Sequence, residues 1–285
     1  MIVTRRKLVA GGLAAAGATV IHPALAHQAG SGAGVRAGAG AECALTPLQK
    51  FMRIRSSQAG RRTFWSYSGQ LLGQIGDTPL QPLFSIIGAS QTIAQWQEDG
   101  TILYEMVEAG YYGNVESGEI ADNPLTNILT GEPVQPEHYL SPQKNTFTAD
   151  LTVLPSAPVP ADLGSFEGKI TPPDEKGDRI WMAERLTGML YETPQRARRV
   201  FNSLANFEAS IADVCGQGEF VPATMQYTTL NSFRPWMNMG DAAGNIMSRL
   251  NAVKCEQWSD VDAALRARIE ADHPGVFGPG VIDDA

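Results

Sequence analysis

The stretch TFWSYSGQLLGQI, Thr63 to Ile75, predicts an extended β-strand. It is rich in aromatic and β-branched residues, and the turn sequence GDTP follows it directly. Three further runs of this kind lie at residues 82–90, 91–97 and 101–115, and the turn sequences EDG and ESGE interrupt them. This part of the chain therefore predicts several short strands joined by tight turns.

The second half of the chain predicts more strands. They are expected at residues 178–192, 220–233 and 243–255. The Pro-rich segment 153–177 is expected to be a long surface excursion, because proline cannot lie in a central strand. Strand patterns resume after it, so we expect one interrupted domain and not two.

Residues 194–215 allow two interpretations. The favoured one is a short helix, since Thr193 and Pro194 form a good helix start and apolar residues recur at helical spacing. The other is a strand, in which Phe207, Ala209 and Ile211 alternate with polar residues.

The C-terminal region predicts a helix. Ser259 and Asp262 fit a capping box, and Val261, Leu265 and Ile269 form one apolar face. Many short strands with few helices indicate a mainly β fold. We expect a single antiparallel β-barrel-like domain with a few peripheral helices, including this C-terminal one.

The first 26 residues predict a cleaved export signal. Arg5 and Arg6 form a twin-arginine pair, and Ala24-Leu25-Ala26 fits an A-x-A cleavage site. The apolar run between them is shorter than the ~20 residues that span a bilayer. We therefore expect recognition by the Tat export machinery, a periplasmic location and no stable membrane insertion after cleavage. Residues 27–41 predict a flexible Gly/Ala linker, which leaves 42–285 as the folded domain.

Charge and cysteine content narrow the function. The net charge of −8 becomes −11 after cleavage, because Arg5, Arg6 and Lys7 are lost and no acid is. An acidic chain is not expected to bind nucleic acid. Among Cys43, Cys215 and Cys255, Cys215 can pair with Cys255, or all three can be free thiols. With no H-E-x-x-H, G-x-S-x-G or Walker pattern, we expect no metal and no cofactor.

Two side chains are candidates for proton transfer. His138 is the one histidine in the middle of the expected domain, and its side chain titrates near neutral pH. Glu105 lies beside Tyr104 in an expected strand, where burial would raise the pKa of its carboxyl. Each also has an ordinary interpretation as a surface residue.

Alternating residues on two strands predict a ligand-binding lumen. One face of the strand 178–192 carries Trp181, Arg185, Met189 and Tyr191, and one face of the strand 220–233 carries Met225, Tyr227, Thr229, Asn231 and Phe233. Such mixtures of aromatic, polar and cationic groups suit a barrel interior that holds a small aromatic ligand. A half-exposed sheet is the alternative.

The segment RPWMNMGDAAG, residues 234–244, predicts a turn between two strands at a barrel mouth. Arg234 can hold an anion, Trp236 offers a stacking face and Met237 adapts to irregular shapes. The segment fits a lid over the mouth or a packed barrel corner.

Three segments resemble the DUF1838 family of bacterial and fungal proteins, a domain of unknown function. They are FWSYSGQLLGQ, the middle region from DGTILYEMVEAGYYGNVESGEI to TGEPVQPEHY, and the late RPWMNMGDAAGNI, so that the resemblance extends over residues 45–279. Where related sequences commonly have Trp before an Asn-Pro pair, this chain has Asp122. The resemblance implies an antiparallel β-barrel-like domain, often secreted, without an assigned chemistry.

These features predict an enzyme of lyase or isomerase type that acts without cofactor on a small aromatic molecule, such as a phenolic plant-derived dimer. His138 or Glu105 would be the base, and Arg185 or Arg234 would hold the phenolate. The binding residues would be Tyr104, Trp181, Tyr227, Asn231, Trp236 and Met237. The alternative is a non-catalytic periplasmic binding protein for an apolar or aromatic molecule.

Overall fold

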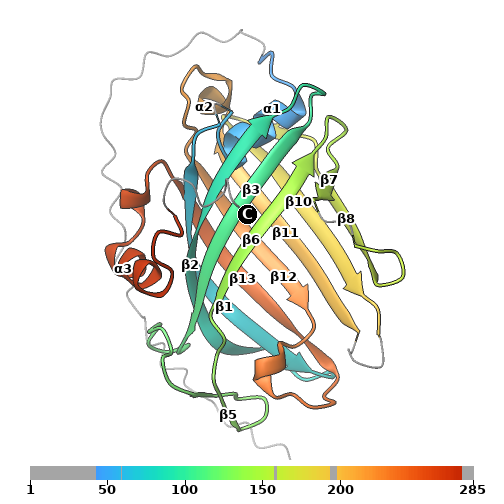
Figure 1. Ribbon diagram of the computed structural model, residues 1–285, viewed down its shortest axis with the longest axis vertical. Helices are drawn as coiled ribbons and strands as arrows, with labels where there is room; N and C mark the ends of the chain where they lie inside the picture. Colours follow the sequence, from blue (N-terminus) through green and yellow to red (C-terminus); the bar gives the residue numbers. More distant parts are fainter. Residues whose placement is uncertain (1–42, 59, 157–158, 193–197, 278–285) are drawn as a thin grey trace, which may run out of the picture. The chain divides into compact units, whose positions relative to one another are not determined.

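The computed structural model describes residues 43–58, 60–156, 159–192 and 198–277. The predicted signal and linker lie outside the described residues. One antiparallel sheet dominates the described part, in the strand order β7-β6-β3-β2-β1-β13-β12-β11-β10-β8, and β9 pairs with β10 (Figure 1). Its strands are β1 (Thr63–Ile75), β2 (Gln81–Trp96), β3 (Ile102–Gly113), β6 (Tyr139–Phe147), β7 (Val153–Pro155), β8 (Gly164–Ile170), β9 (Asp174–Lys176), β10 (Arg179–Leu190), β11 (Arg199–Ser210), β12 (Ala223–Asn231) and β13 (Gly244–Cys255).

The sheet curves into a nearly closed barrel. Its two ends meet where Ile170 N donates to Leu151 O at 2.8 Å and where Thr152 bridges to Lys169. Closure at this seam removes the free edges that would otherwise expose unpaired backbone groups. The predicted mainly β, barrel-like architecture is confirmed.

Side chains alternate between the interior and the outer surface along each strand. On β1, Trp65, Tyr67 and Leu71 are buried in the interior cluster, whereas Ser68 and Gln70 are exposed. Because register fixes which residues share a face, each neighbouring strand continues the same interior layers.

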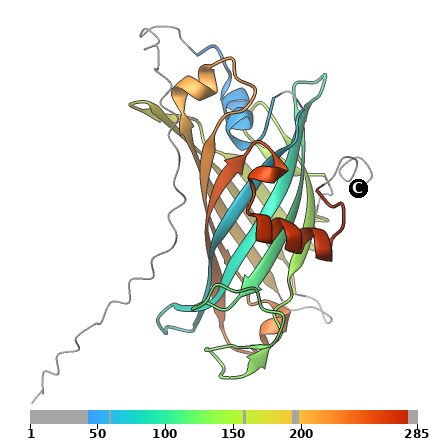
Figure 2. The same ribbon diagram turned by 90° about the vertical axis from the view of Figure 1, so that its left-hand side faces the viewer.

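The helix α1 (Pro47–Arg55) fills one end of the barrel (Figures 1 and 2). Thr46 and Gln49 form a capping box at its start. Phe51, Met52 and Ile54 are fully buried in the interior cluster, and the Phe51 ring meets Phe207 of β11 edge-on at 5.5 Å.

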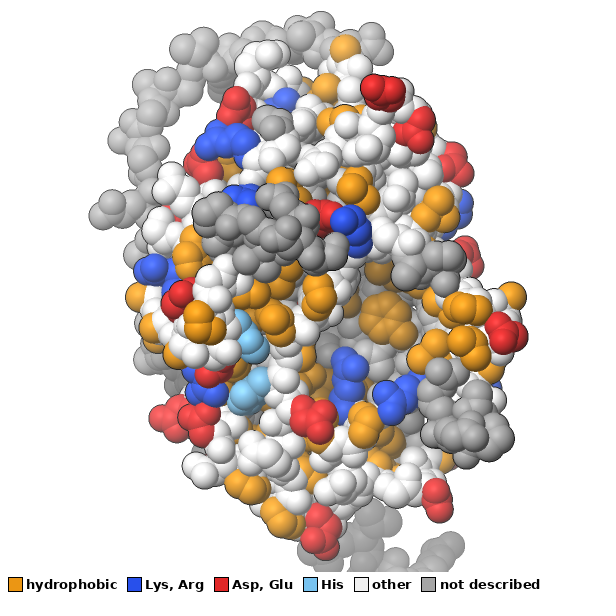
Figure 3. All heavy atoms as spheres, viewed as in Figure 1, with side chains coloured by type: hydrophobic (Ala, Val, Ile, Leu, Met, Phe, Trp, Pro, Cys, Tyr) orange, Lys and Arg blue, Asp and Glu red, His pale blue; other side chains and the backbone are white. Residues whose placement is uncertain are grey.

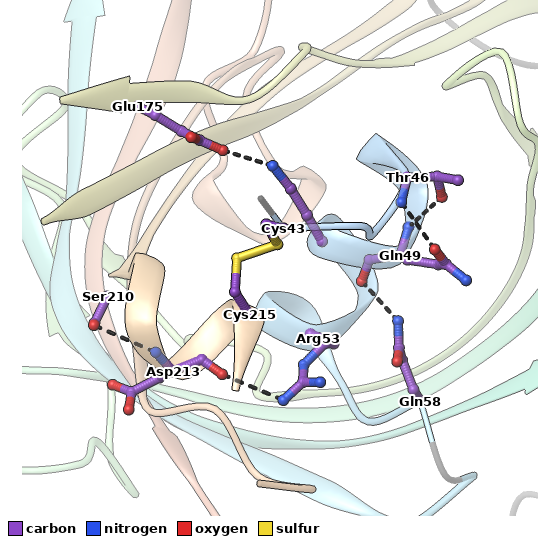
Figure 4. Close-up of a disulfide and its surroundings, with 10 residues drawn as sticks. Cys43, Thr46, Gln49, Arg53, Gln58, Glu175, Ser210, Asp213 and Cys215 are labelled. Carbon is purple, nitrogen blue, oxygen red and sulfur yellow. Dashed lines mark hydrogen bonds and ion pairs between the residues drawn. A yellow bond between two sulfur atoms is a disulfide. The ribbon is translucent and has the colours of Figure 1, made fainter. Parts of the chain in front are cut away.

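A disulfide joins Cys43, just before α1, to Cys215 in α2 (Ile211–Cys215), with Cα atoms 5.4 Å apart (Figure 4). Both sequence interpretations of the cysteines were wrong: the free thiol is Cys255, which is buried. Arg53 strengthens the same junction by donating to Asp213 O at 3.2 Å. α1 is therefore held to the β11–β12 connection.

The helix α3 (Ala263–Asp272) lies on the outer surface of the barrel, against β2 (Figure 2). Val261, Leu265 and Ile269 are buried there, as predicted. The N-cap of α3 is Asp262, three residues after the expected Ser259, and its side chain accepts from Leu265 N at 3.0 Å. The 3-10 helix η2 (Trp258–Asp260) precedes it.

Two expectations are corrected. The Pro-rich segment is not a continuous excursion, since it contributes β7 and β8 at the barrel seam and β9 beside β10. The favoured helix over 194–215 is wrong for Arg199–Ser210, which form β11 between β10 and β12, and only Ile211–Cys215 is helical. Residues 193–197 lie outside the described part.

Candidate functional site in the barrel lumen

The interior of the barrel is polar at its middle. Tyr67 of β1, Glu108 of β3 and Tyr139 of β6 come together there; β6 and β3 are neighbours, and β2 separates β3 from β1. Tyr139 Oη donates to Glu108 Oε1 at 3.1 Å, and the hydroxyls of Tyr67 and Tyr139 lie 3.0 Å apart. Tyr67 Oη also donates to Ala109 O at 3.2 Å.

Counting hydrogens shows which protonation state suits this chain of contacts. Three contacts link Glu108, Tyr139, Tyr67 and Ala109 O, but the two tyrosines supply two hydrogens. An ionised Glu108 accepts from Tyr139, whereas a protonated Glu108 reverses that bond and supplies the third hydrogen, so that Glu108 donates to Tyr139, Tyr139 to Tyr67, and Tyr67 to the carbonyl. The chain is therefore fully satisfied when Glu108 is a neutral carboxylic acid.

The electrostatics agree with this count. Burial raises the pKa of Glu108, although hydrogen bonds from Tyr67 and Tyr139 oppose the rise. Burial and the nearby Glu108 carboxylate raise the pKa of both tyrosines well above the ordinary value. Glu108 thus holds a proton at higher pH than a carboxyl in water.

Two glycines make room for the two tyrosines. Gly88 of β2 and Gly110 of β3 pair directly across the strands. A Cβ at Gly88 would lie 2.2 Å from Tyr67 Oη, and a Cβ at Gly110 would lie 2.2 Å from the Tyr139 ring. Any larger residue at either position displaces a member of the hydrogen-bonded chain.

The lumen around this chain is not fully filled. Glu108 and Tyr139 lie on interior faces, yet both keep partly accessible surface, and so do Met106, Gln143 and Tyr227. Polar side chains from the opposite wall complete this layer: Ser203, Thr229 and Ser248. Glu108 therefore keeps accessible surface inside the lumen.

Loops cover part of the end opposite α1. The 3-10 helix η1 (Pro235–Met237) packs Trp236 against Phe84 and Tyr112, with ring centroids 5.3 and 5.2 Å apart. The short hairpin of β4 (Leu125–Thr126) and β5 (Pro133–Val134) reinforces it, because the buried Asn127 amide donates to Met237 O at 2.9 Å. Both loops appear at the lower end in Figure 1.

Beside these loops the barrel is open. A pocket of about 280 Å³ lies where β8 and β11 begin and where β10 and β12 end. It is lined by apolar residues that include Phe166, Phe201 and Phe233, by Asn231, and by Arg199 and Arg234. Figure 3 shows a hollow on this side, with apolar side chains in it and Lys or Arg side chains at its edge.

Arg234 links the pocket to the lumen. Its charge lowers the pKa of Glu108 and of the Tyr112 hydroxyl, in each case against the larger effect of burial. Arg234 thus lines the open pocket, and its charge also acts on the buried carboxyl. The segment 234–244, predicted as a lid or a corner, provides both a packed Trp236 and an open cationic edge.

A second carboxyl lies in the interior, towards α1. Glu184 of β10 forms a buried ion pair with Arg55, with Nε and Oε2 3.0 Å apart, and Arg55 stacks over the Tyr104 ring at 4.8 Å from its centroid. Burial, the largest single effect, lowers the pKa of Arg55, but Glu184 together with Tyr104, Tyr227 and Glu108 outweighs it, and the net shift is upward. This pair anchors α1 inside the barrel.

The structure brings several predicted residues together. Tyr104, Tyr227 and Asn231 lie on interior faces, and Trp236 and Met237 lie in the loop over the open end. Arg234 lines the pocket. The predicted lumen face of the strand 220–233 is thus confirmed for β12.

The predicted lumen face of β10 is wrong. Glu184 pairs with Ile170 of β8, which places Glu184, Leu186 and Leu190 inside and the alternate residues outside. Arg185 therefore faces outward, 3.9 Å from Glu167. Trp181 is an even number of residues from Arg185 on the same strand, so it also lies on the outer face.

Glu105 and His138 also lie outside the lumen. Glu105 forms an ion pair with Lys144 across the outer faces of β3 and β6. His138 Nδ1 accepts from Tyr112 N at 3.2 Å, and its ring stacks on Tyr111 at 5.1 Å. Burial, with the nearby Arg268, lowers the pKa of His138.

The sequence contained an overlooked signal for Glu108. Side chains on a strand alternate, so that Tyr104, Glu108 and Tyr112 share a face and Glu105 cannot. A glycine inside a strand often marks the close approach of another group, which is what Gly88 and Gly110 permit. These two cues together point to β3 as the carrier of a packed polar cluster.

The described residues define a β-barrel protein with a polar, partly open lumen. No three His, Cys, Asp or Glu side chains within the described ranges group as metal ligands would, and no helix there is long and apolar enough to cross a bilayer. A family model with the description "Protein of unknown function (DUF1838)" matches residues 193–278, which confirms the family resemblance over β11 to α3. Comparisons with curated proteins and with solved structures gave no match.

Proposed function

We propose that this protein is a cofactor-independent enzyme of lyase or isomerase type that acts on a small phenolic molecule in the barrel lumen. The observation that carries the proposal is the chain from Glu108 through Tyr139 to Tyr67, in which Glu108 keeps accessible surface inside the lumen. A carboxylic acid whose pKa is raised by burial is suited to general acid catalysis.

The chemistry needs one proton carrier. Glu108 gives its proton to an ether oxygen of the substrate as the C–O bond breaks with its electron pair on that oxygen. Electrons move through the ring from the phenol, whose proton returns to Glu108, so that no proton is gained or lost overall.

Glu108 takes the proton-transfer role that the sequence suggested for His138 or Glu105. The aromatic walls of the lumen and mouth, Tyr227 and Trp236 among them, would contact the substrate ring. The disulfide between Cys43 and Cys215 supports a periplasmic location after Tat export, since disulfides persist in oxidising compartments.

The test begins with mass spectrometry of ligands that co-purify with the exported protein, followed by turnover assays on phenolic dimers. Glu108→Gln should lower turnover by roughly 10²–10⁴-fold while ligand binding persists. Glu105→Gln is the matched control, because it changes the same residue type on the same strand at the outer face. Equal turnover of Glu108→Gln and the wild type would contradict the catalytic role of Glu108, and ligand binding without turnover in the wild type would contradict the enzyme proposal and favour a binding protein.

A further inference from the structure

The pocket at the open end carries two arginines that approach it from adjacent strands. Val200 N donates to Ser232 Oγ at 3.1 Å and Ser232 N donates to Val200 O at 3.2 Å, which extends the β11–β12 ladder to this point. Arg199 and Arg234 therefore flank Phe233, and both line the pocket.

Neither guanidinium forms a salt bridge with an acid in the part of the chain that the structure describes. This is notable in a chain with 30 acidic and 22 basic residues. Two unneutralised arginines beside an otherwise apolar pocket favour an anionic group that comes from outside the chain.

The apolar walls indicate what accompanies the anion. Phe166, Phe201 and Phe233 line the pocket, and Gly188 pairs across the strands with the first two and adds no side chain. This arrangement leaves a slot for a flat ring. A pocket of about 280 Å³ is near the small end of ligand sites, which run from ~300 to ~1,000 Å³.

We propose that Arg199 and Arg234 recognise the carboxylate of an aromatic acid whose ring passes between these phenylalanines toward Glu108. The inference rests on the proposed function and names its substrate class, an aromatic compound with a free carboxylate. The planar guanidinium fork matches a carboxylate in bidentate geometry.

The buried site tolerates such an anion. Burial raises the pKa of Glu108, so this carboxyl ionises less readily than an ordinary glutamate and opposes a bound anion less. Repulsion between ligand and site is thereby reduced.

The test compares two probes on the purified exported protein at pH 7: 4-hydroxycinnamate and its neutral amide. Binding is measured by titration calorimetry for the wild type, Arg199→Gln, Arg234→Gln and Arg185→Gln. The wild type should prefer the carboxylate by roughly tenfold to hundredfold, the range of charge-assisted hydrogen bonds. Arg199→Gln and Arg234→Gln should each reduce that preference, whereas Arg185→Gln on the outer face should keep it.

A second pair of variants blocks the slot without touching an arginine. A Cβ at Gly188 would meet no atom closer than 3.6 Å, so Gly188→Leu fits the strand and projects into the pocket. It should abolish binding of both probes, and the neighbouring outward-facing Thr187→Leu should not.

The outcomes separate the two proposals. Equal affinity for acid and amide in the wild type, or an unchanged preference in both arginine variants, overturns the carboxylate assignment and leaves the proposed function standing. Binding of neither probe overturns the proposed function together with the assignment.

Discussion

Glu105 and Glu108 lie three residues apart on β3, and they face opposite sides of the barrel wall. Glu105 pairs with Lys144 outside, and Glu108 accepts from Tyr139 inside. The alternation of a β-strand therefore turns two identical side chains into one ion pair on the outer face and one acid in the lumen.

The stability of the wild type should fall with rising pH relative to Glu108→Gln. The pKa of Glu108 is raised in the folded state, so the folded chain holds more protons than the unfolded chain between the ordinary value near ~4.3 and the raised one. The free energy of unfolding then decreases across that window. Urea unfolding at several pH values from about 4 upward checks this; parallel curves for the two proteins would contradict it.

Lys254 should make stability depend on pH in the opposite direction. Burial lowers its pKa to about 7, and its amine donates to Arg53 O at 2.8 Å and to Ser56 O at 2.5 Å at the end of α1. Between about pH 7 and the unfolded value of ~10.4, the unfolded chain binds more protons, so stability should rise with pH. Urea unfolding of the wild type should show this rise relative to Lys254→Met, and a difference that is constant with pH would refute it.

Breaking the ion pair of Arg55 and Glu184 should be costly. Arg55→Met leaves the buried Glu184 carboxylate unpaired, which typically costs about 3–5 kcal/mol of unfolding free energy. The double variant Arg55→Met/Glu184→Met should recover most of the loss, because both charges are removed. Thermal and urea unfolding of the three proteins measure the effect; a double variant as unstable as the single one would indicate that packing matters more than charge.

Loss of the disulfide should destabilise the fold. It closes a span of 172 residues, and removal of native disulfides typically costs about 2–5 kcal/mol. A reductant should lower the melting temperature of the wild type and leave that of Cys43→Ala unchanged. If the reductant shifts both proteins equally, the effect comes from elsewhere in the chain.

Much of the barrel could be predicted from the sequence because glycine, proline and turn residues mark the strand ends. β12 was oriented correctly: polar and apolar residues alternate along it, and the face that carries Tyr227 was predicted to be inside. β10 was not, because both of its faces carry apolar residues, and the register with β8 decides which face is inside. Such pairing depends on residues far apart in the sequence.

The prediction of a helix around Val200 and Leu204 was wrong for a related reason. Their spacing fits a helix, but β10 and β12 offer pairing along the whole length of β11. Tertiary pairing overrides local periodicity there. The disulfide partner of Cys43 was equally hidden, because it depends on the position of α1 against α2.

The closed end of the barrel has a consequence for turnover. In the part of the chain that the structure describes, Phe51, Met52 and Ile54 pack across that end, and the pocket opens at the other, beside η1. A reaction in the lumen that cleaves one molecule into two and releases both fragments through this pocket would release them in a fixed order. The fragment nearer the pocket leaves first, and the inner one, while it remains, competes directly with the next substrate.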